Sequence, residues 1–434
     1  MRPTPSPQTP QDCRLAGEQR RKKFPRAALA HWSSNDRKHD PLKLIVKSLH
    51  DRVEALSPLK YKRMCASPFG FFRGAAPVMA YDLSLSKNTG ISAQLCGDAH
   101  VQNLGAYTGP DGRLIFDIND FDETIRGPFE WDLKRMATSI LLTGDYAHLK
   151  QSACNTAAEM FLSSYAGLMQ QLSRMPILAV ARFQVHRLGG VAPIFKILRK
   201  AEHETPMHSL ERLTEDTAHG RIFKTSPPLL KRLTGPDASA VLASLKPYTH
   251  SLLPERQHFL SQYRPIDVAF KVVGTGSIGL RDYCVLLQGN GTRDPLFLQI
   301  KQEAPSVYAE YLPKSQVENE NNGKRTADGQ RAMQLQSDPL LGWTRLGGRD
   351  YLVRQLNDHK ASVDIATLKA SDLAEYAAVC GELLARGHAR SGDARTIAGY
   401  IGNGARFKSA MLDFAQSYAA QTATDWKALV KSRA

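Results

Sequence analysis

The chain has 434 residues and a formal net charge of +15; 42% of its residues are hydrophobic and 23% are charged. This composition is ordinary for a globular protein, and the length predicts two or three subdomains. No apolar run approaches the roughly 20 residues that span a bilayer, and the first residues lack the apolar segment of a secretory signal.

The hydrophobic pattern places a strand-rich module between two helical segments. We expect a basic, partly disordered leader at 1–40, a helical lobe at 41–265, a β-rich lobe at 266–357, and C-terminal helices at 358–434 that complete the helical lobe. No internal repeat is found.

Within these segments, periodicity predicts individual elements. Helices are expected at 41–56, 131–142 and 152–172, with more helices to about residue 263 and again from residue 366 onward. Short buried strands are expected at 91–95 and 114–118, on either side of a polar loop at 97–103. Further strands are expected at 268–273, 281–287, 295–301 and 351–356, with a hairpin turn at 288–292 and a polar loop at 319–323.

A glycine-rich pattern, Gly274-x-Gly276-Ser277-x-Gly279, follows the first of these later strands. A dinucleotide-binding loop opens a helix, but here a strand and a hairpin turn follow. A glycine-rich hairpin tip, followed by a strand that carries Lys301, matches the kinase arrangement in which backbone amides cover phosphates and a lysine contacts them. The alternative is an ordinary hairpin tip with a surface lysine.

The loop at 97–103 carries Asp98, His100 and Asn103, with Asp98 and Asn103 five positions apart. This is the spacing of a kinase catalytic loop, where the aspartate accepts the proton of the substrate hydroxyl and the asparagine holds a magnesium ion. The alternative is a plain turn in which Asp98 caps the backbone and Asn103 adopts a left-handed conformation.

Four acidic residues, Asp117, Asp120, Asp122 and Glu123, follow shortly after the strand at 114–118. Carboxylates gathered at one strand end repel one another unless a cation offsets them. We therefore expect Asp117, Asp120 and Asp122, together with Asn103, to bind metal. In the alternative reading these acids pair with Arg126, Lys134 or Arg135.

Two further segments have polar residues of interest. Arg73 is a candidate for orienting a phosphate through two hydrogen bonds from its guanidinium. An equally good interpretation is a structural ion pair with Asp82 or with one of the acids above. The segment from His388 to Asp393 stands where a conventional kinase would place its catalytic loop. It lacks an asparagine five residues beyond Asp393, so we interpret it first as a helix cap and turn, and second as a wall of the active site.

The longest motifs resemble a known family. The runs 67–76, 97–100, 116–124 and 127–135 are similar to the bacterial domain of unknown function 2252 family, and 351–356 and 388–393 extend the resemblance over roughly residues 20 to 430. No settled activity comes with that resemblance.

A second, more distant resemblance concerns mechanism. The Gly97-Asp98-x-His100-x-x-Asn103 loop is similar to the catalytic loop of aminoglycoside and choline phosphotransferases, which have the protein-kinase-like fold. That resemblance implies Asp98 as the base, Asn103 and Asp120 as metal ligands, and Lys301 as the phosphate-contacting lysine. Cys96 stands where a histidine is usual. Glu310 is a candidate carboxylate partner for Lys301.

The order of the two lobes is reversed relative to that family, which circular permutation explains. We therefore expect an α+β, protein-kinase-like, two-lobed fold that is circularly permuted. The predicted catalytic residues are Asp98, His100 and Arg73, and the predicted cofactor-binding residues are Gly274, Gly276, Ser277, Gly279 and Lys301.

The predicted function is phosphoryl transfer from ATP, with Mg²⁺, to an unknown small-molecule or protein hydroxyl. Two alternatives remain open: a nucleotide- or anion-binding regulatory protein without turnover, and a basic nucleic-acid-binding protein. The second of these is possible but not favoured, because no helix-turn-helix, zinc-finger or RNA-binding signature accompanies the positive charge.

The number and spacing of the cysteines indicate the cellular compartment. The six cysteines have no C-x-x-C spacing, so neither a zinc site nor a disulfide framework is indicated. A reducing environment fits this pattern, and we expect a cytoplasmic protein that does not enter a membrane.

Overall fold

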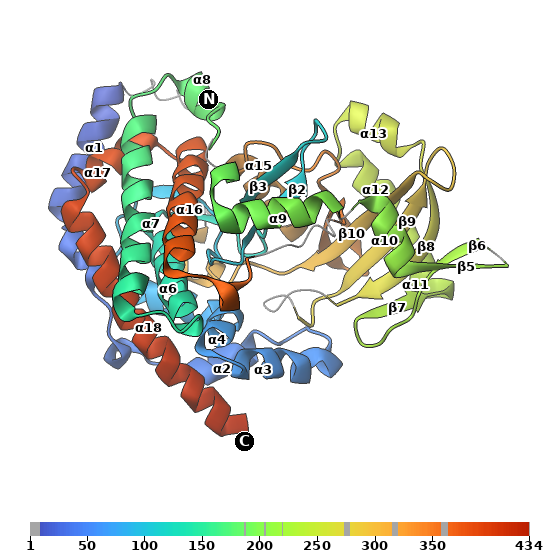
Figure 1. Cartoon of the computed structure of the whole chain (residues 1–434), viewed down its shortest axis with the longest axis horizontal. Coiled ribbons are helices and arrows are strands. Elements are labelled where there is room, and N and C mark those ends of the chain that lie inside the picture. Colours follow the sequence, from blue (N-terminus) through green and yellow to red (C-terminus); the bar gives the residue numbers. More distant parts are fainter. Residues whose placement is uncertain are drawn as a thin grey trace.

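The computed structural model describes residues 9–185, 188–203, 205–218, 220–272, 278–314, 320–356 and 363–433. The described structure contains many helices together with a large antiparallel sheet, so the expected α+β class is confirmed. Figure 1 shows a bundle of helices on the left and a twisted sheet on the right, with shorter strands between them. Within the described ranges, no helix has both the length and the apolar character needed to cross a bilayer.

The helices in the first half of the chain are α1 (Pro10–Lys23), α2 (Pro41–Lys47), α3 (Ser57–Cys65), α4 (Pro68–Gly74), α5 (Ala76–Ser84), α6 (Glu130–Tyr146), α7 (Gln151–Leu172), α8 (Ile177–Ala181), α9 (Ala192–His203) and α10 (Pro206–Leu213). The later helices are α11 (Gly235–Ala243), α12 (Leu245–His250), α13 (Pro254–Leu260), α15 (Asn322–Met333), α16 (Ala370–Ser391), α17 (Ala394–Ile401) and α18 (Ala405–Arg433).

The strands form one large sheet and three small antiparallel pairs. The large sheet has the order β11-β12-β10-β9-β8-β7, and every neighbouring pair in it is antiparallel. Its strands are β7 (Leu230–Leu233), β8 (Arg264–Lys271), β9 (Asp282–Gln288), β10 (Pro295–Glu303), β11 (Gly342–Leu346) and β12 (Arg349–Gln355). The small pairs join β1 (Ser92–Leu95) with β4 (Ile125–Pro128), β2 (Leu104–Thr108) with β3 (Leu114–Ile118), and β5 (Thr214–Thr217) with β6 (Gly220–Phe223).

Most predicted elements are present. The strand expected at 114–118 is β3, the helix expected at 152–172 is α7 with one more residue at its start, and the helix expected from 366 begins at Ala370. These elements were predictable because they are buried along a regular face, as α16 is from Leu373 to Leu384.

Several predictions were wrong. The helix expected at 41–56 ends at Lys47, and Asp51 has a positive φ of 63°, so the chain turns although the apolar spacing continues. The segment up to 263 was expected to be helical, but it contains β5, β6 and β7, and β5 is too polar to show an alternating pattern. The segment expected as a loop at 319–323 contains the start of α15, where the Asn321 side chain accepts a hydrogen bond from Lys324 N–H.

The basic leader contains α1, which the composition of this segment did not indicate. Thr9 and Asp12 form a capping box at its start, and the side chain of Thr9 accepts a hydrogen bond of 3.1 Å from Asp12 N–H. The face of α1 that carries Cys13 and Gly17 is buried against α17. Gly17 is required there, because a Cβ atom would lie 2.1 Å from the carbonyl oxygen of Thr396.

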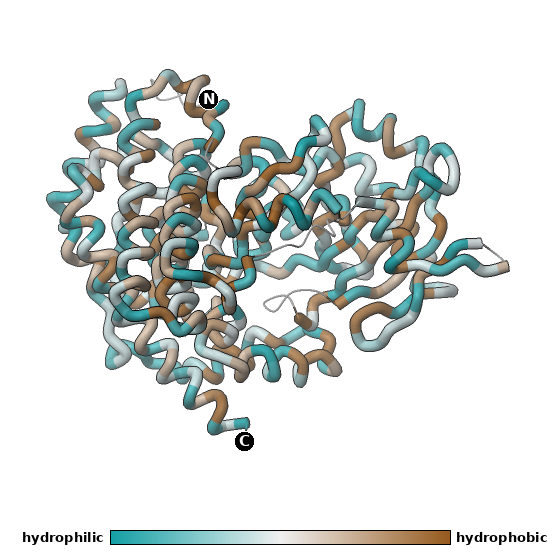
Figure 2. The backbone as a smooth tube through the Cα atoms, in the orientation of Figure 1, coloured by the Kyte–Doolittle hydropathy of each residue, from teal (hydrophilic) through white to brown (hydrophobic). Residues whose placement is uncertain are grey.

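The hydrophobic core has one large part and smaller parts around the sheet. The large cluster joins α4 to α7 and α16 to α18 with the small strand pairs β1–β4 and β2–β3. One face of the large sheet packs on α11, α12 and α13, and the other packs on α10 and β6. Figure 2 shows brown, hydrophobic stretches alternating with teal ones along the helices, as expected where one face of each helix is buried.

Candidate functional site

The loop after β1, which carries Asp98, is held by the N-terminal end of α6. The carboxylate of Asp132 accepts hydrogen bonds from the backbone N–H groups of Cys96 (2.9 Å) and Gly97 (3.0 Å). His388 of α16 lies with its Nε2 3.2 Å from the same carboxylate, and its Nδ1 lies 2.9 Å from the hydroxyl of Tyr165. This buried network fixes the direction in which the loop leaves the strand.

Gly97 permits two loops to approach each other closely. Its φ is +85°, and a Cβ atom on it would lie 2.2 Å from the carbonyl oxygen of Glu123. Any other residue would strain the backbone and collide with the neighbouring loop. The close approach brings the loop at 97–103 against the acidic loop at 119–124.

Asp98 is paired with a fully buried arginine. Arg135 of α6 donates from Nε to Asp98 Oδ1 at 2.6 Å, and its Nη2 forms a second, shorter contact with the same oxygen. The side chain of Asp98 is 18% exposed, and its other oxygen, Oδ2, lies 3.8 Å from His100 Nε2. One carboxylate oxygen therefore anchors the side chain, while the other faces the neighbouring imidazole.

His100 is a neutral imidazole in this environment. Burial lowers the pKa of His100 to about 3; nearby Asp98 opposes that shift, whereas Arg73 and Arg135 add to it. Its Nδ1 accepts a hydrogen bond from Gln102 N–H at 3.2 Å, so the single ring proton lies on Nε2. The N–H of His100 thus points toward Asp98 Oδ2.

Asn103 links the two loops. Its amide nitrogen donates to the carbonyl oxygens of Asp98 (2.8 Å) and Asp120 (3.0 Å), and its Oδ1 accepts from Asp120 N–H at 2.7 Å. This arrangement orients the two aspartates relative to each other. The role of Asn103 as a metal ligand stays a prediction. A metal ion bound to its Oδ1 would share this oxygen with the backbone N–H of Asp120.

Lys301 lies against the acidic loop. Its ammonium is 2.5 Å from Asp122 Oδ1 and 3.5 Å from Asp120 Oδ1, and the lysine side chain is almost completely buried. Burial alone would lower the pKa of Lys301, but Asp120 and Asp122 raise it above its ordinary value. Burial, and then the charge of Asp120, raise the pKa of Asp122.

A further carboxylate lies behind this cluster. Glu303 is buried at the end of β10, where its Oε2 accepts from the Thr326 hydroxyl at 2.9 Å and its Oε1 has no hydrogen-bond partner in the described structure. Burial and the nearby charge of Asp122 raise the pKa of Glu303 well above its usual range. Arg325 of α15 donates to the carbonyl oxygens of Asp122 and Ala304, and so ties the acidic loop to the strand.

Asp117 occupies a different environment from Asp120 and Asp122. It is completely buried in β3, and both of its carboxylate oxygens lie 2.6 Å from Arg386 Nη2 of α16. Its role as a metal ligand stays a prediction. The negative charge that would attract a cation is already paired with the guanidinium of Arg386.

Three basic side chains lie opposite the acids. Arg52 follows α2, Lys60 belongs to α3 and Arg73 to α4. Lys60 is 2% exposed, and its ammonium makes no hydrogen bond or ion pair with any described residue. Burial, and then the charge of Arg52, lower the pKa of Lys60 to about 7. Arg73 donates to Gln102 Oε1 at 2.8 Å, which keeps it beside the loop of Asp98.

These groups line a single small cavity of about 60 Å³. Its walls are formed by Ser48, Arg52, Lys60, Arg73, Gly74, Ala76, Pro77, Asp98, His100, Asp120, Asp122, Glu123, Leu280, Glu303 and Ala304. Segments from the N-terminal helices, the two central loops and the large sheet therefore meet at one place.

Only the last glycine of the predicted phosphate-covering loop falls within the described structure. Gly274, Gly276 and Ser277 lie outside the described residues. Gly279 has a φ of +92°, and its carbonyl oxygen accepts from Val53 N–H at 2.6 Å. Leu280, the next residue, lines the cavity, so the glycine-rich segment ends beside the predicted catalytic residues.

The acidic cluster gathers carboxylate oxygens, and magnesium binding there stays a prediction. Among the described residues, no three His, Cys, Asp or Glu side chains are placed so that they alone could hold an ion. Mg²⁺ is usually held by one or two carboxylates together with substrate phosphates. Asp120 and Asp122, with the unpartnered Oε1 of Glu303 behind them, supply oxygen ligands of the required kind.

Other predicted pairings differ in the structure. Glu310 was the wrong partner for Lys301, because it lies on the surface with its carboxylate 2.9 Å from Lys47. Asp82 pairs with Arg37 rather than Arg73. Of the basic residues proposed to pair with the acidic loop, Arg135 pairs instead with Asp98.

The segment 388–393 is divided between two roles. His388 belongs to the buried network behind the Asp98 loop, whereas Asp393 caps α17 by accepting from Arg395 N–H at 3.0 Å. The interpretation as a helix end and turn is therefore confirmed, because α16 stops at Ser391 and α17 starts at Ala394.

Sequence reasoning missed Arg52, Lys60 and Glu303, and it named Arg135 only as a possible partner of the acidic loop. Their local patterns carry no recognisable motif. Only Glu303 could have been found from the sequence. It lies two positions after Lys301 in the same strand, and alternate residues of a strand share a face, so the two side chains were expected on one side of the sheet.

Comparisons with known proteins identify a family and no individual relative. Searches of the curated proteins and of the solved structures gave no match. The family described as "Uncharacterized protein conserved in bacteria (DUF2252)" matches residues 52–432. The match includes all the residues that line the cavity except Ser48, and the chain belongs to this DUF2252 family.

Proposed function

We propose that the protein is a phosphotransferase that uses Mg-ATP, with a circularly permuted, kinase-like arrangement of its two lobes. The proposal is carried by one observation: Asp98, Asp120 and Asp122 from the central loops line one cavity, and Lys301 from the large sheet contacts two of them, Asp120 and Asp122. These are the residue types that bind phosphate, accept a hydroxyl proton and bind magnesium in kinases.

The charges around the cavity favour a nucleotide bound with a cation. The lining includes the carboxylates of Asp98, Asp120, Asp122, Glu123 and Glu303 and the basic groups of Arg52, Lys60 and Arg73. Free polyphosphate would be repelled by the acids, and a bare cation would be repelled by the basic side chains. The metal–phosphate end of a magnesium nucleotide is compatible with both walls, because its metal would face carboxylates and its phosphate oxygens would face ammonium and guanidinium groups, while the rest of the nucleotide would extend beyond this cavity of about 60 Å³.

In this proposal each side chain has a separate task. Asp98 Oδ2 accepts the proton of the acceptor hydroxyl, and His100 lies beside that oxygen as a neutral imidazole, with its Nε2 3.8 Å away. Asp120 and Asp122 would hold Mg²⁺, which neutralises phosphate charge when it is bound. Lys60, Arg73 and Lys301 orient phosphate oxygens. Positioning and electrostatic stabilisation supply most of the rate enhancement in such sites.

A second candidate is a nucleotide-binding protein without turnover. It is favoured by the Asp98–Arg135 pair, because a carboxylate bonded to a fully buried arginine also has a purely structural role. Two measurements separate the candidates. Calorimetric titration with Mg-ATP tests binding, and release of labelled phosphate from γ-labelled ATP in a single turnover tests transfer. Binding with release supports the phosphotransferase, binding alone supports the second candidate, and no binding of Mg-ATP contradicts both.

A further inference from the structure

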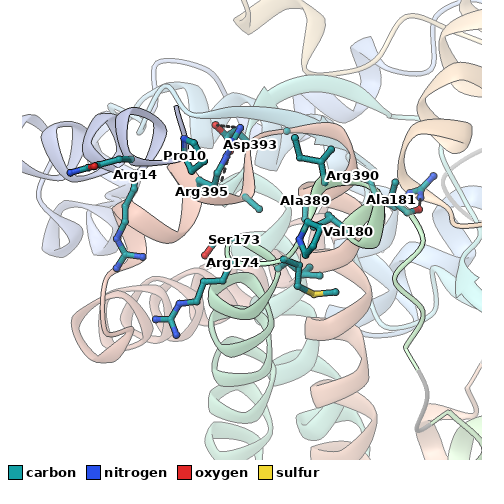
Figure 3. Close-up of a pocket in the computed structure, with 17 residues that line it drawn as sticks. Pro10, Arg14, Ser173, Arg174, Val180, Ala181, Ala389, Arg390, Asp393 and Arg395 are labelled. Carbon is teal, nitrogen blue, oxygen red and sulfur yellow. Dashed lines mark hydrogen bonds and ion pairs between the residues drawn. The ribbon is translucent and has the colours of Figure 1, made fainter. Parts of the chain in front are cut away.

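A second, larger cavity lies outside the candidate site. It has a volume of about 860 Å³, and none of its lining residues lines the cavity around Asp98. The start of α1, the end of α7, all of α8, the end of α16 and the start of α17 surround it (Figure 3). A cavity of this size is in the range of small-molecule sites.

Much of the lining is apolar and accessible. Met175, Pro176, Ile177 and Val180 contribute hydrophobic surface to it, whereas Leu172 and Ala389, also in the lining, are buried. Helix α8 consists only of apolar residues, Ile-Leu-Ala-Val-Ala, yet none of them is buried. Ile177, at its start, is 76% exposed. Exposed apolar surface gathered at one place on a folded protein is typical of a binding site.

The charged part of the lining is basic. Four arginines, Arg14, Arg174, Arg390 and Arg395, line the cavity, whereas Asp393 is the only acidic residue among the lining side chains. Asp393 is already engaged, because Arg395 Nε donates to it at 2.9 Å, as the dashed lines in Figure 3 mark. Arg14 lies 3.5 Å from Glu18, so Arg174 and Arg390 are the positive charges of the lining that have no ion pair within the described structure.

Two of these arginines lack an anionic partner. The side chain of Arg174 makes no hydrogen bond or ion pair with any described residue. Arg390 donates from Nη1 to the carbonyl oxygen of Ala181, while its Nε is buried without a hydrogen-bond partner in the described structure. Burial, and then the charge of Arg386, lower the pKa of Arg390. The guanidinium of Arg390 is thus enclosed by the protein, and the exposed guanidinium of Arg174 is the one that can meet the acceptor oxygens of a ligand.

We propose that this cavity binds an amphiphilic organic anion, whose apolar body packs against α8 and Met175 and whose carboxylate or phosphate is held by Arg174. A free metabolite with an acyl or alkyl chain and a membrane lipid with an anionic headgroup share this chemistry. The site is independent of phosphoryl transfer at Asp98.

The test uses decyl phosphate, titrated below its micelle concentration into the full chain in a calorimeter. We expect saturable binding of one molecule per chain, and affinity lower by about tenfold or more for decyltrimethylammonium, which has the same tail and the opposite charge. Arg174→Glu is expected to weaken binding of decyl phosphate by about tenfold or more. Arg113→Glu, a matched charge change at another exposed arginine, is expected to leave it unchanged.

A second arm distinguishes the two sources of the anion. If the protein co-sediments with phosphatidylglycerol vesicles but not with phosphatidylcholine vesicles, and Arg174→Glu abolishes this, the ligand is a membrane lipid. Binding of decyl phosphate without co-sedimentation would assign a free metabolite. Ala181→Trp places a bulky ring at an exposed position of the lining and is expected to reduce binding in either case. Equal affinity for the anionic and cationic probes, or wild-type affinity in Arg174→Glu, would overturn the proposal.

Discussion

The ammonium of Lys301 lies 2.5 Å from Asp122 Oδ1, although 179 positions separate the two residues in the chain. Lys301 is on a strand of the large sheet, and Asp122 is on the loop before β4. The pair joins the two parts of the molecule at the edge of the cavity. It also places a lysine and a carboxylate where the proposed function requires a phosphate contact and a metal ligand.

Replacing this lysine tests how the buried charges are balanced. Lys301→Met is expected to lower the free energy of unfolding by about 3–5 kcal/mol, because buried carboxylates lose their cation. Added Mg²⁺ should restore part of the loss by occupying the same oxygens. Thermal unfolding with and without Mg²⁺ measures both effects. Lys324→Met, which removes an exposed pair with Asp328, is the control and should cost about 1 kcal/mol or less. Equal losses in the two variants would contradict this account.

Asp98→Asn is expected to separate binding from transfer. The amide retains an oxygen for Arg135 but cannot accept the hydroxyl proton, so single-turnover phosphate release should fall by about 10²–10⁴-fold. Mg-ATP affinity measured by calorimetry should change by only a few fold. Asp111→Asn, at a mostly exposed residue of the β2–β3 turn, is the control. An unchanged rate in Asp98→Asn would exclude this residue as the base.

The buried amine of Lys60 predicts that nucleotide binding depends on pH. Its pKa is about 7, and phosphate oxygens beside it would favour the protonated form, so binding above pH 7 requires uptake of a proton. Affinity for Mg-ATP should therefore fall by roughly tenfold for each pH unit between 8 and 9. Lys60→Met should bind more weakly at pH 6.5 and lose this pH dependence. Parallel slopes in the wild type and the variant would show that Lys60 does not contact the nucleotide.

Lys60 also makes the stability of the fold depend on pH. The direction of this dependence is opposite to that of a salt-bridged lysine, whose pKa is raised on folding. The pKa of Lys60 falls from 10.5 to about 7 on folding, so between these values the unfolded chain binds more protons and stability rises with pH. Below pH 7 the full cost of the buried charge is present. Lys60→Met should therefore raise the melting temperature, and raise it more at pH 6 than at pH 10. Lys62→Met, at an exposed position of the same helix, should show no such difference.

Two aspartate variants decide which carboxylates bind metal. Asp117→Asn weakens a buried ion pair with Arg386 and is expected to cost about 3–5 kcal/mol in the free energy of unfolding. Its Mg-ATP affinity, measured at a temperature where the variant remains folded, should equal that of the wild type. Asp122→Asn should instead reduce that affinity by about tenfold. A comparable loss in both variants would place Asp117 in the metal site.

Local signals were sufficient for much of the fold. Helices such as α7 and strands such as β3 have regular hydrophobic patterns, and the family motifs cover residues from both parts of the molecule. The strands β5 to β7 were missed because they are short and largely exposed. The turn near Asp51 was missed because apolar residues continue through it.

The candidate site was only partly predictable for a related reason. Asp98 was found because its spacing to Asn103 is that of a kinase catalytic loop, and Asp120 and Asp122 were found because several acids lie close together in the chain after a buried strand. Lys60 has no such context, since it is a lysine in an ordinary amphipathic helix, and only packing buries its amine. Arg135 is similarly one basic residue in a long helix until Asp98 is placed beside it.

The order of the residues determined which segments form helices and strands and which short loops concentrate acids, because those properties depend on near neighbours in the chain. Tertiary structure alone decided that Lys301 meets Asp122, that Arg135 rather than Arg126 holds an acid, and that Lys60 faces the same cavity. Charge pairing across such sequence distances depends on the path of the backbone and on the exclusion of water, and neither is encoded in any local pattern.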